Sequence, residues 1–199
     1  MPKKIIMESD VIDIDSYIKD RESIKKRIKE HKSSRRIHVG PHATFYFESF
    51  DTMLYQVQEM LFIERGGREQ LQDELKAYNP LIPSGQSLVA TLMFEIDNPE
   101  IRKKFLNSIG GIEQNTFIQI QDQKIYSRAE NDTNRTNEKG KASSVQFLHF
   151  DFDESKVKLF TDKHSEVSLG FDHENYHHIS ILSSIVKKSL VEDFDLESI

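Results

Sequence analysis

The stretch of residues 88–96 constrains the fold of this chain most, because it is apolar on both faces that a strand presents. Leu88, Ala90, Leu92, Phe94 and Ile96 lie on one face, and Val89 and Met93 lie on the other. Side chains alternate between the two faces of a strand, so a strand of this kind is buried on both sides. The chain must therefore build a sheet that other layers cover on both of its faces.

The other segments show helical and strand patterns without the strict alternation of a β-α-β fold. Asp15 and Ser16 are expected to cap the first helix, and Gly66-Gly67 to end the second. We expect helices at 15–32, 50–65, 68–77, 99–109, 154–162 and 183–194, and strands at 36–39, 42–48, 88–96, 116–121, 124–128, 144–152, 167–171 and 176–182. The sequence therefore predicts a single α+β domain over 1–199, with helices packed on a mixed, mostly antiparallel sheet.

Two further segments lack the apolar residues that packing requires. Residues 129–142 are rich in Asn, Thr, Glu and Lys, so we expect a mobile loop there. Residues 195–199 are expected to form an acidic tail.

The composition excludes several kinds of chemistry. The 199 residues include no Cys, which rules out disulfides, thiolate nucleophiles, cysteine zinc sites and an iron–sulfur cluster held by cysteine. No apolar stretch approaches the roughly 20 residues that a membrane helix needs. The N-terminal residues lack the apolar core of a secretory signal, so we expect a cytoplasmic protein without membrane contact.

Charge is distributed unevenly along the chain. The formal net charge is −6, yet residues 19–36 contain nine basic and three acidic residues. The basic helix expected at 15–33 offers a docking surface for an acidic partner or for a second copy of the chain in a homodimer. Nucleic acid is a less favoured partner, because no aromatic residues are interleaved with the basic ones. The residues proposed for this surface are Lys25, Lys26, Arg27, Arg35 and Arg36.

The strand expected at 42–48 presents a row of polar groups. His42, Thr44, Tyr46 and Glu48 share one face, while Phe45 and its apolar neighbours share the other. An ordinary strand with a solvated polar face has the same pattern. The row is nevertheless a candidate binding site, because imidazole and carboxylate groups both bind metals.

Glu59 is the most unusual residue of the helix expected at 50–65. Bulky side chains surround it at helical spacing, and no basic residue lies within one turn. A carboxylate buried in this way must be paired, bound to a metal or neutralised. Glu64 differs, because Arg65 and Arg68 are near enough to pair with it.

A third polar cluster lies between the last two expected strands. Residues 172–178 contain three of the eight histidines of the chain, together with Asp172. Short His-rich tracts bind metals, although a polar turn is the commoner explanation. His173 is the candidate ligand of this cluster.

Several blocks of the sequence resemble a known bacterial family. The run GPHATFYFE at 40–48, the adjoining pattern at 51–64, the strand at 87–96, the block at 136–148 and Asp172-His173 with Tyr176 are all similar to the domain of unknown function 3501 (DUF3501). The resemblance covers nearly the whole chain. Members of that family look like companions of rubrerythrin-type and iron–sulfur oxidoreductase genes, which implies a role in redox or peroxide defence by association. The polar positions that match the family pattern are His42, Glu48, Tyr55, Gln56, Glu59, Glu64, Asp172 and His173.

The first functional hypothesis is an accessory protein that binds a metal or a small ligand. Its site consists of His42, Glu48, Glu59 and His173, supported by Tyr55, Gln56, Glu64 and Asp172. A divalent metal such as iron suits these ligands. The implied partner is a redox protein, either rubrerythrin-like or an iron–sulfur oxidoreductase.

Two alternatives fit the same residues. In one, the protein is a non-enzymatic docking module whose Glu59 and Glu64 are structural and pair with Arg35 or Arg36. In the other, it is a metal-free hydrolase or isomerase that uses Glu59 as base and His42 as acid.

Overall fold

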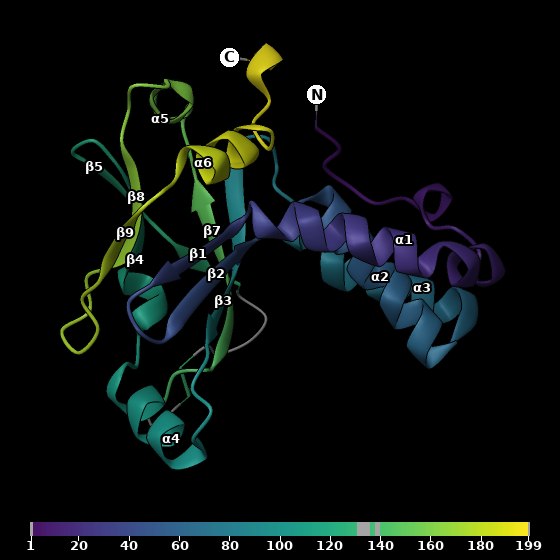
Figure 1. Ribbon diagram of the computed structural model, residues 1–199, viewed down its shortest axis with the longest axis horizontal. Helices are drawn as coiled ribbons and strands as arrows, with labels where there is room; N and C mark the ends of the chain where they lie inside the picture. The colour runs from purple at the N-terminus through teal and green to yellow at the C-terminus, as the bar shows by residue number, and fades with distance from the viewer. Residues whose placement is uncertain (1, 131–135, 138–139, 199) are drawn as a thin grey trace.

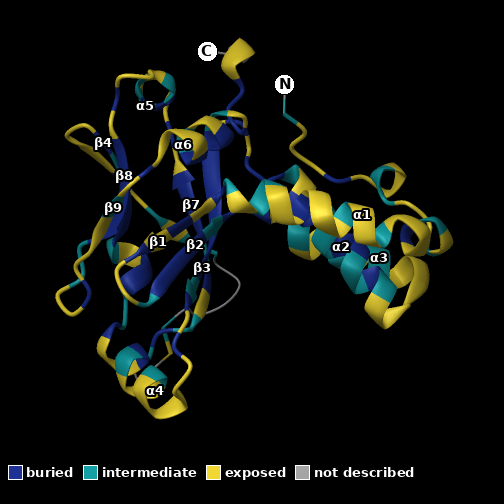
Figure 2. Cartoon of the chain, in the orientation of Figure 1, coloured by how far each residue is buried: buried dark blue, intermediate teal, exposed yellow. Residues whose placement is uncertain are grey.

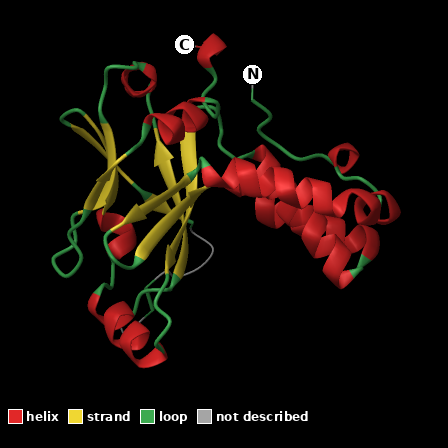
Figure 3. Cartoon of the chain, viewed as in Figure 1, coloured by secondary structure: helices red, strands yellow, loops and turns green. Residues whose placement is uncertain are grey.

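A computed structural model describes residues 2–130, 136–137 and 140–198 of the chain (Figure 1). Strands form two sheets that face each other, and three helices project from them as an arm (Figures 1 and 3). The first sheet has the order β1-β2-β3-β7-β6 and the second has the order β5-β4-β8-β9, with every paired strand antiparallel. The first sheet contains β1 (Arg36–Val39), β2 (Ala43–Phe47), β3 (Ser87–Phe94), β7 (Val145–Asp151) and β6 (Arg128–Ala129); the second contains β5 (Gln123–Tyr126), β4 (Thr116–Ile120), β8 (Val167–Phe171) and β9 (Ile179–Ile181).

The main hydrophobic core lies between the two sheets (Figure 2). Leu88, Leu92 and Phe94 of β3 face this core, which explains one apolar side of that strand. The Phe94 ring lies 6.3 Å, between centroids, from the ring of Phe171 in the second sheet. Three helices lie around the edges of the two sheets: α4 (Pro99–Ser108), α5 (Glu154–Thr161) and α6 (Ser184–Val191).

The helical arm has a second, smaller core. Its helices are α1 (Ile14–Ser33), α2 (Phe50–Glu64) and α3 (Gly67–Tyr78). Val57 and Leu61 of α2 and Leu75 of α3 pack in this core together with Val89 of β3. Val89 lies on the strand face opposite the main core, so β3 is buried on both sides as its sequence requires.

Four short 3-10 turns complete the described structure. They are η1 (Glu8–Asp10), η2 (Asn79–Leu81), η3 (Ile112–Asn115) and η4 (Leu196–Ser198). Among the described residues, no helix is both long and apolar enough to cross a membrane.

The α+β prediction is confirmed, but the strands divide between two antiparallel sheets instead of joining one mixed sheet. Two predicted helix ends were also wrong. Asp13 caps α1, because its carboxylate accepts a hydrogen bond from the Ser16 backbone N–H. Arg65 itself adopts the left-handed conformation that ends α2, with a φ of 53°.

The predicted loop and tail also differ from expectation where the structure describes them. Residues 128–129 pair with β7, and Thr136 bridges Ala142, while 131–135 and 138–139 lie outside the described residues. The tail starts at Asp195, which is buried and forms an ion pair of 2.8 Å with Lys4.

Candidate functional site

The structure places His42 in an aromatic cluster. Its ring centroid lies 4.9 Å from that of Phe105 and 6.4 Å from that of Tyr176. The backbone N–H groups of His42 and Ala43 donate to the Tyr176 hydroxyl, which in turn donates to the Val39 carbonyl. These contacts stabilise the turn between β1 and β2.

Glu59 forms an ion pair between two helices of the arm. Nε and Nη2 of Arg21 donate to its two oxygens, each over 2.8 Å, and the Tyr17 hydroxyl donates a short hydrogen bond. The hydrogen bond from Arg21 holds the pKa of Glu59 below its usual value, against the effect of burial. Pairing was one of the alternatives expected for this carboxylate, beside metal binding and neutralisation, but the partner is Arg21 and not the predicted Arg35 or Arg36.

The remaining predicted polar residues have separate local partners. Glu64 is exposed and accepts a hydrogen bond of 3.1 Å from Gln70. Lys124 and Tyr126 donate to Asp172, over 2.6 and 2.8 Å, and the Lys124 bond in particular lowers the pKa of Asp172. The ring of His173 contacts the Gly110 carbonyl and the Asn175 backbone N–H at its two nitrogens, each over 3.2 Å.

The predicted four-residue site is therefore not assembled. His42, Glu48, Glu59 and His173 lie in four different local environments, each with its own partners. In the part of the chain that the structure describes, no group of three or more His, Asp or Glu side chains is arranged to hold a metal ion. The reason is that strand parity and helix spacing place side chains within one element but do not place the elements relative to one another.

Glu48 lies in a hollow where the arm meets the outer face of the first sheet. We call this the corner hollow. It has a volume of about 340 Å³. Strands β2, β3 and β7 form its floor, and α2 and α3 form its wall.

 The corner hollow is lined by Lys32, Tyr46, Glu48, Met53, Gln56, Tyr78, Leu81, Thr91, Met93, Val145 and Phe147.

The Glu48 carboxylate is held in this hollow by two hydroxyl groups. Thr52 of α2 donates to one oxygen and Thr91 of β3 donates to the other, each over 2.6 Å. Glu48 is only 6% exposed. Within the described residues, no Lys, Arg or His lies within ion-pair distance of it. This buried carboxylate therefore has hydrogen-bond donors but no cationic partner.

Local structure fixes the position of Glu48 closely. It lies between the end of β2 and the start of α2, where Ser49 and Thr52 form a reciprocal capping box. Its backbone N–H donates to the Val89 carbonyl over 2.8 Å, and its backbone carbonyl accepts from Nη2 of Arg35, also over 2.8 Å. The main chain is thus held on both sides while the carboxylate faces the hollow.

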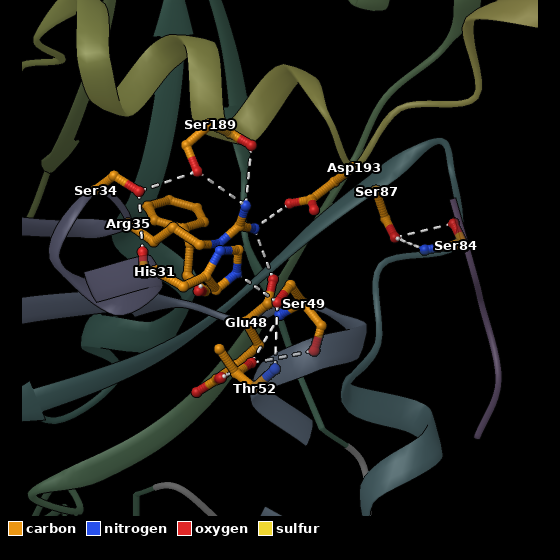
Figure 4. A network of polar contacts seen from close by, with 11 residues as sticks. His31, Ser34, Arg35, Glu48, Ser49, Thr52, Ser84, Ser87, Ser189 and Asp193 are labelled. Carbon is orange, nitrogen blue, oxygen red and sulfur yellow. Dashed lines mark hydrogen bonds and ion pairs between the residues drawn. The ribbon is translucent and has the colours of Figure 1, made fainter. Parts of the chain in front are cut away.

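Arg35 is the centre of a buried polar network behind Glu48 (Figure 4). It is 1% exposed, donates to the carbonyls of Phe47 and Ser189, and forms an ion pair with Asp193. Burial raises the pKa of Asp193 to about 6, although Arg35 opposes the rise. The prediction that Arg35 belongs to a docking surface was therefore wrong, because its guanidinium joins β2 to the C-terminal segment.

Phenol groups form part of the wall of the corner hollow. Burial raises the pKa of Tyr78, and Gln56 interacts with its hydroxyl. Burial and the nearby Glu95 raise the pKa of Tyr46, whose hydroxyl donates to Glu95 over 3.2 Å. The hollow therefore combines apolar surface with a small number of polar groups, which is typical of small-molecule sites.

Sequence reasoning missed several residues of this hollow. Thr91 interrupts the otherwise apolar stretch of β3, and that interruption is the signal that could have found it. Tyr78 and Lys32 give no such signal, because the tertiary fold alone brings α1 and α3 beside the sheet.

Comparisons with known proteins agree with the resemblance seen in the sequence. The profile of the family described as "Protein of unknown function (DUF3501)" matches residues 5–194, while no curated protein matches the chain. The fold is similar to the crystal structure of a novel protein of unknown function from Burkholderia pseudomallei K96243. That protein is 31% identical, with a TM-score of 0.88, and the match covers 96% of this chain and 99% of that chain. The chain therefore belongs to the DUF3501 family.

Proposed function

We propose that this protein binds a small molecule in the corner hollow, and that Glu48 recognises an N–H or ammonium group of the ligand. The observation that carries the proposal is the buried Glu48 carboxylate, which has no cationic partner among the described residues. Burying a carboxylate is costly unless it is paired or fully hydrogen-bonded. A ligand with a cationic or N–H donor group supplies the missing partner.

The carboxylate retains capacity for such a ligand. An ionised carboxylate has about four acceptor positions, and the hydroxyls of Thr52 and Thr91 use one on each oxygen. The surrounding walls include Met53, Leu81 and Phe147, which favour an apolar or aromatic ligand body. These features support a flat aromatic ligand that carries an amine or amidine.

Benzamidine is a suitable probe, because its planar N–H groups match the geometry of a carboxylate. We expect it to bind the wild-type protein in isothermal titration calorimetry. Glu48→Gln should weaken binding by about ten- to a hundredfold, because one charge-assisted contact is lost. Glu64→Gln is the matched control, since Glu64 lies on α2 but outside the hollow.

Two outcomes would overturn the proposal. One is the absence of a binding isotherm with the wild type, and the other is equal affinity for the wild type and Glu48→Gln. If Glu48→Gln does not fold, Thr91→Val provides the second variant, because it keeps the carboxylate and removes one of its two hydroxyl donors.

The finer predictions from the sequence remain predictions. The role in redox or peroxide defence and the redox partner are supported by the family resemblance alone, and a divalent metal such as iron is tested by metal analysis of the purified protein. The hydrolase or isomerase alternative loses support, because Glu59 is paired with Arg21 and its lowered pKa makes it a weak base.

A further inference from the structure

A second hollow adjoins the corner hollow and is strongly basic. We call it the basic hollow. It has a volume of about 430 Å³ and shares Lys32 and Tyr46 with the corner hollow. Its lining contains four cationic side chains and no carboxylate. The lining residues are Lys25, Ile28, Lys29, Lys32, Ser33, Arg36, Tyr46 and Tyr55.

Helix geometry explains why these cations gather. Lys25, Lys29 and Lys32 are spaced four and three residues apart on α1, so they share one face of the helix. Arg36 begins β1, directly after the helix ends. Like charges at this spacing repel one another. The arrangement therefore costs free energy unless an anion is present.

No ion pair with a carboxylate of the described residues neutralises these four side chains, Lys25, Lys29, Lys32 and Arg36. The ammonium group of Lys32 instead lies 5.9 Å from the ring centroid of Tyr55. Several uncompensated cations around one hollow favour an anion with more than one negative charge, such as a phosphate group.

We propose that the basic hollow binds the phosphate part of the ligand whose N–H group is recognised by Glu48. The ligand class is then an aromatic amine that carries a phosphate or diphosphate, which is the chemistry of a purine nucleotide. The assignment of the amine end rests on the proposed function. The assignment of the phosphate end rests independently on the four cations and on the residues that the two hollows share.

Isothermal titration calorimetry with three probes separates the two ends. Adenosine diphosphate carries both groups, adenosine lacks the phosphates, and pyrophosphate lacks the base. We expect the double variant Lys29→Gln/Arg36→Gln to bind adenosine diphosphate and pyrophosphate at least about tenfold more weakly than the wild type. Its affinity for adenosine should be unchanged. Glu48→Gln should lower the affinity for adenosine and for adenosine diphosphate and leave the affinity for pyrophosphate unchanged.

Lys19→Gln/Lys26→Gln is the matched control, because it removes two exposed charges from α1 outside the basic hollow. Equal weakening of pyrophosphate in both double variants would show a general charge effect and would overturn the proposal. The absence of pyrophosphate binding to the wild type would also overturn it, and binding of polyglutamate in that case would assign the surface to an acidic protein. If the wild type binds pyrophosphate but neither benzamidine nor adenosine, the assignment of an anion-binding site to the basic hollow stands. The function proposed for Glu48 and the composite ligand would then both be refuted.

Discussion

Replacing Glu59 with glutamine tests whether this carboxylate has a structural role. Glu59 accepts hydrogen bonds from Tyr17 and from two nitrogens of Arg21, so it joins α1 to α2. The side chain of Glu59 is 13% exposed and that of Arg21 is 28% exposed. The ion pair is therefore only partly open to water.

The expected loss of stability follows from this burial. Glutamine removes the negative charge and places an amide donor where Arg21 needs an acceptor. Removing one partner of a fully buried ion pair costs about 3–5 kcal/mol. Because water reaches Arg21, we expect a smaller loss of about 2–3 kcal/mol in the free energy of unfolding. In a chain of this length, that loss lowers the Tm by roughly 4–12 °C.

Urea unfolding followed by far-ultraviolet circular dichroism measures this effect, and its pH dependence gives a second test. The Arg21 hydrogen bond lowers the pKa of Glu59 in the folded protein from the ordinary value of 4.5. The stabilisation is therefore present above about pH 4.5 and is lost as the pH falls through the lower, folded-state pKa. The difference between the wild type and Glu59→Gln should be constant near neutral pH and should decrease in acid.

Glu64→Gln is the control, because Glu64 is exposed on the same helix. Its free energy of unfolding should stay within about 0.5 kcal/mol of the wild type. A Glu59→Gln variant as stable as this control, or a stability difference that does not change in acid, would refute a structural ion pair.

Two further substitutions test the buried network and the β1–β2 turn. Asp193→Asn leaves the Arg35 guanidinium buried without its counter-ion, so we expect urea unfolding to show a loss of about 3–5 kcal/mol in the free energy of unfolding. Glu192→Gln, at an exposed neighbouring position, is the control, and an equal loss in both variants would contradict this expectation. Gly40 and Gly111 have φ values of 68° and 80°, but only at Gly40 would a Cβ meet other atoms, 2.6 Å from the His178 ring. Gly40→Ala should therefore lower the Tm more than Gly111→Ala, for which backbone strain alone costs about 1–2 kcal/mol. An equal decrease in Tm for the two variants would refute the steric argument.

Several elements could be predicted from the sequence because their signals are local. The bounds of β1 and β8 were predicted correctly at 36–39 and 167–171. The predicted strand at 176–182 was too long, since β9 covers only Ile179–Ile181. Tyr176 instead forms a bridge with His173 and packs in the aromatic cluster, and both contacts depend on the tertiary fold.

The candidate site was predicted only in part. Glu48 was singled out from the row of polar groups on its strand, whereas its partner Thr91 lies 43 residues away. The cation that pairs with Glu59 lies 38 residues before it, and the Asp193 that pairs with Arg35 lies 158 residues after it. Local spacing carries no information about contacts of this range.

The sequence by itself determined the α+β class, that β3 is buried on both faces, and that cysteine chemistry is absent. These properties depend on the residue types and on side-chain periods of two and 3.6 residues. Only the tertiary structure decided which polar groups meet: Arg21 with Glu59, Arg35 with Asp193, and the two threonines with Glu48. The physical reason is that a buried charge is stabilised by whichever groups the packing of distant elements brings near it.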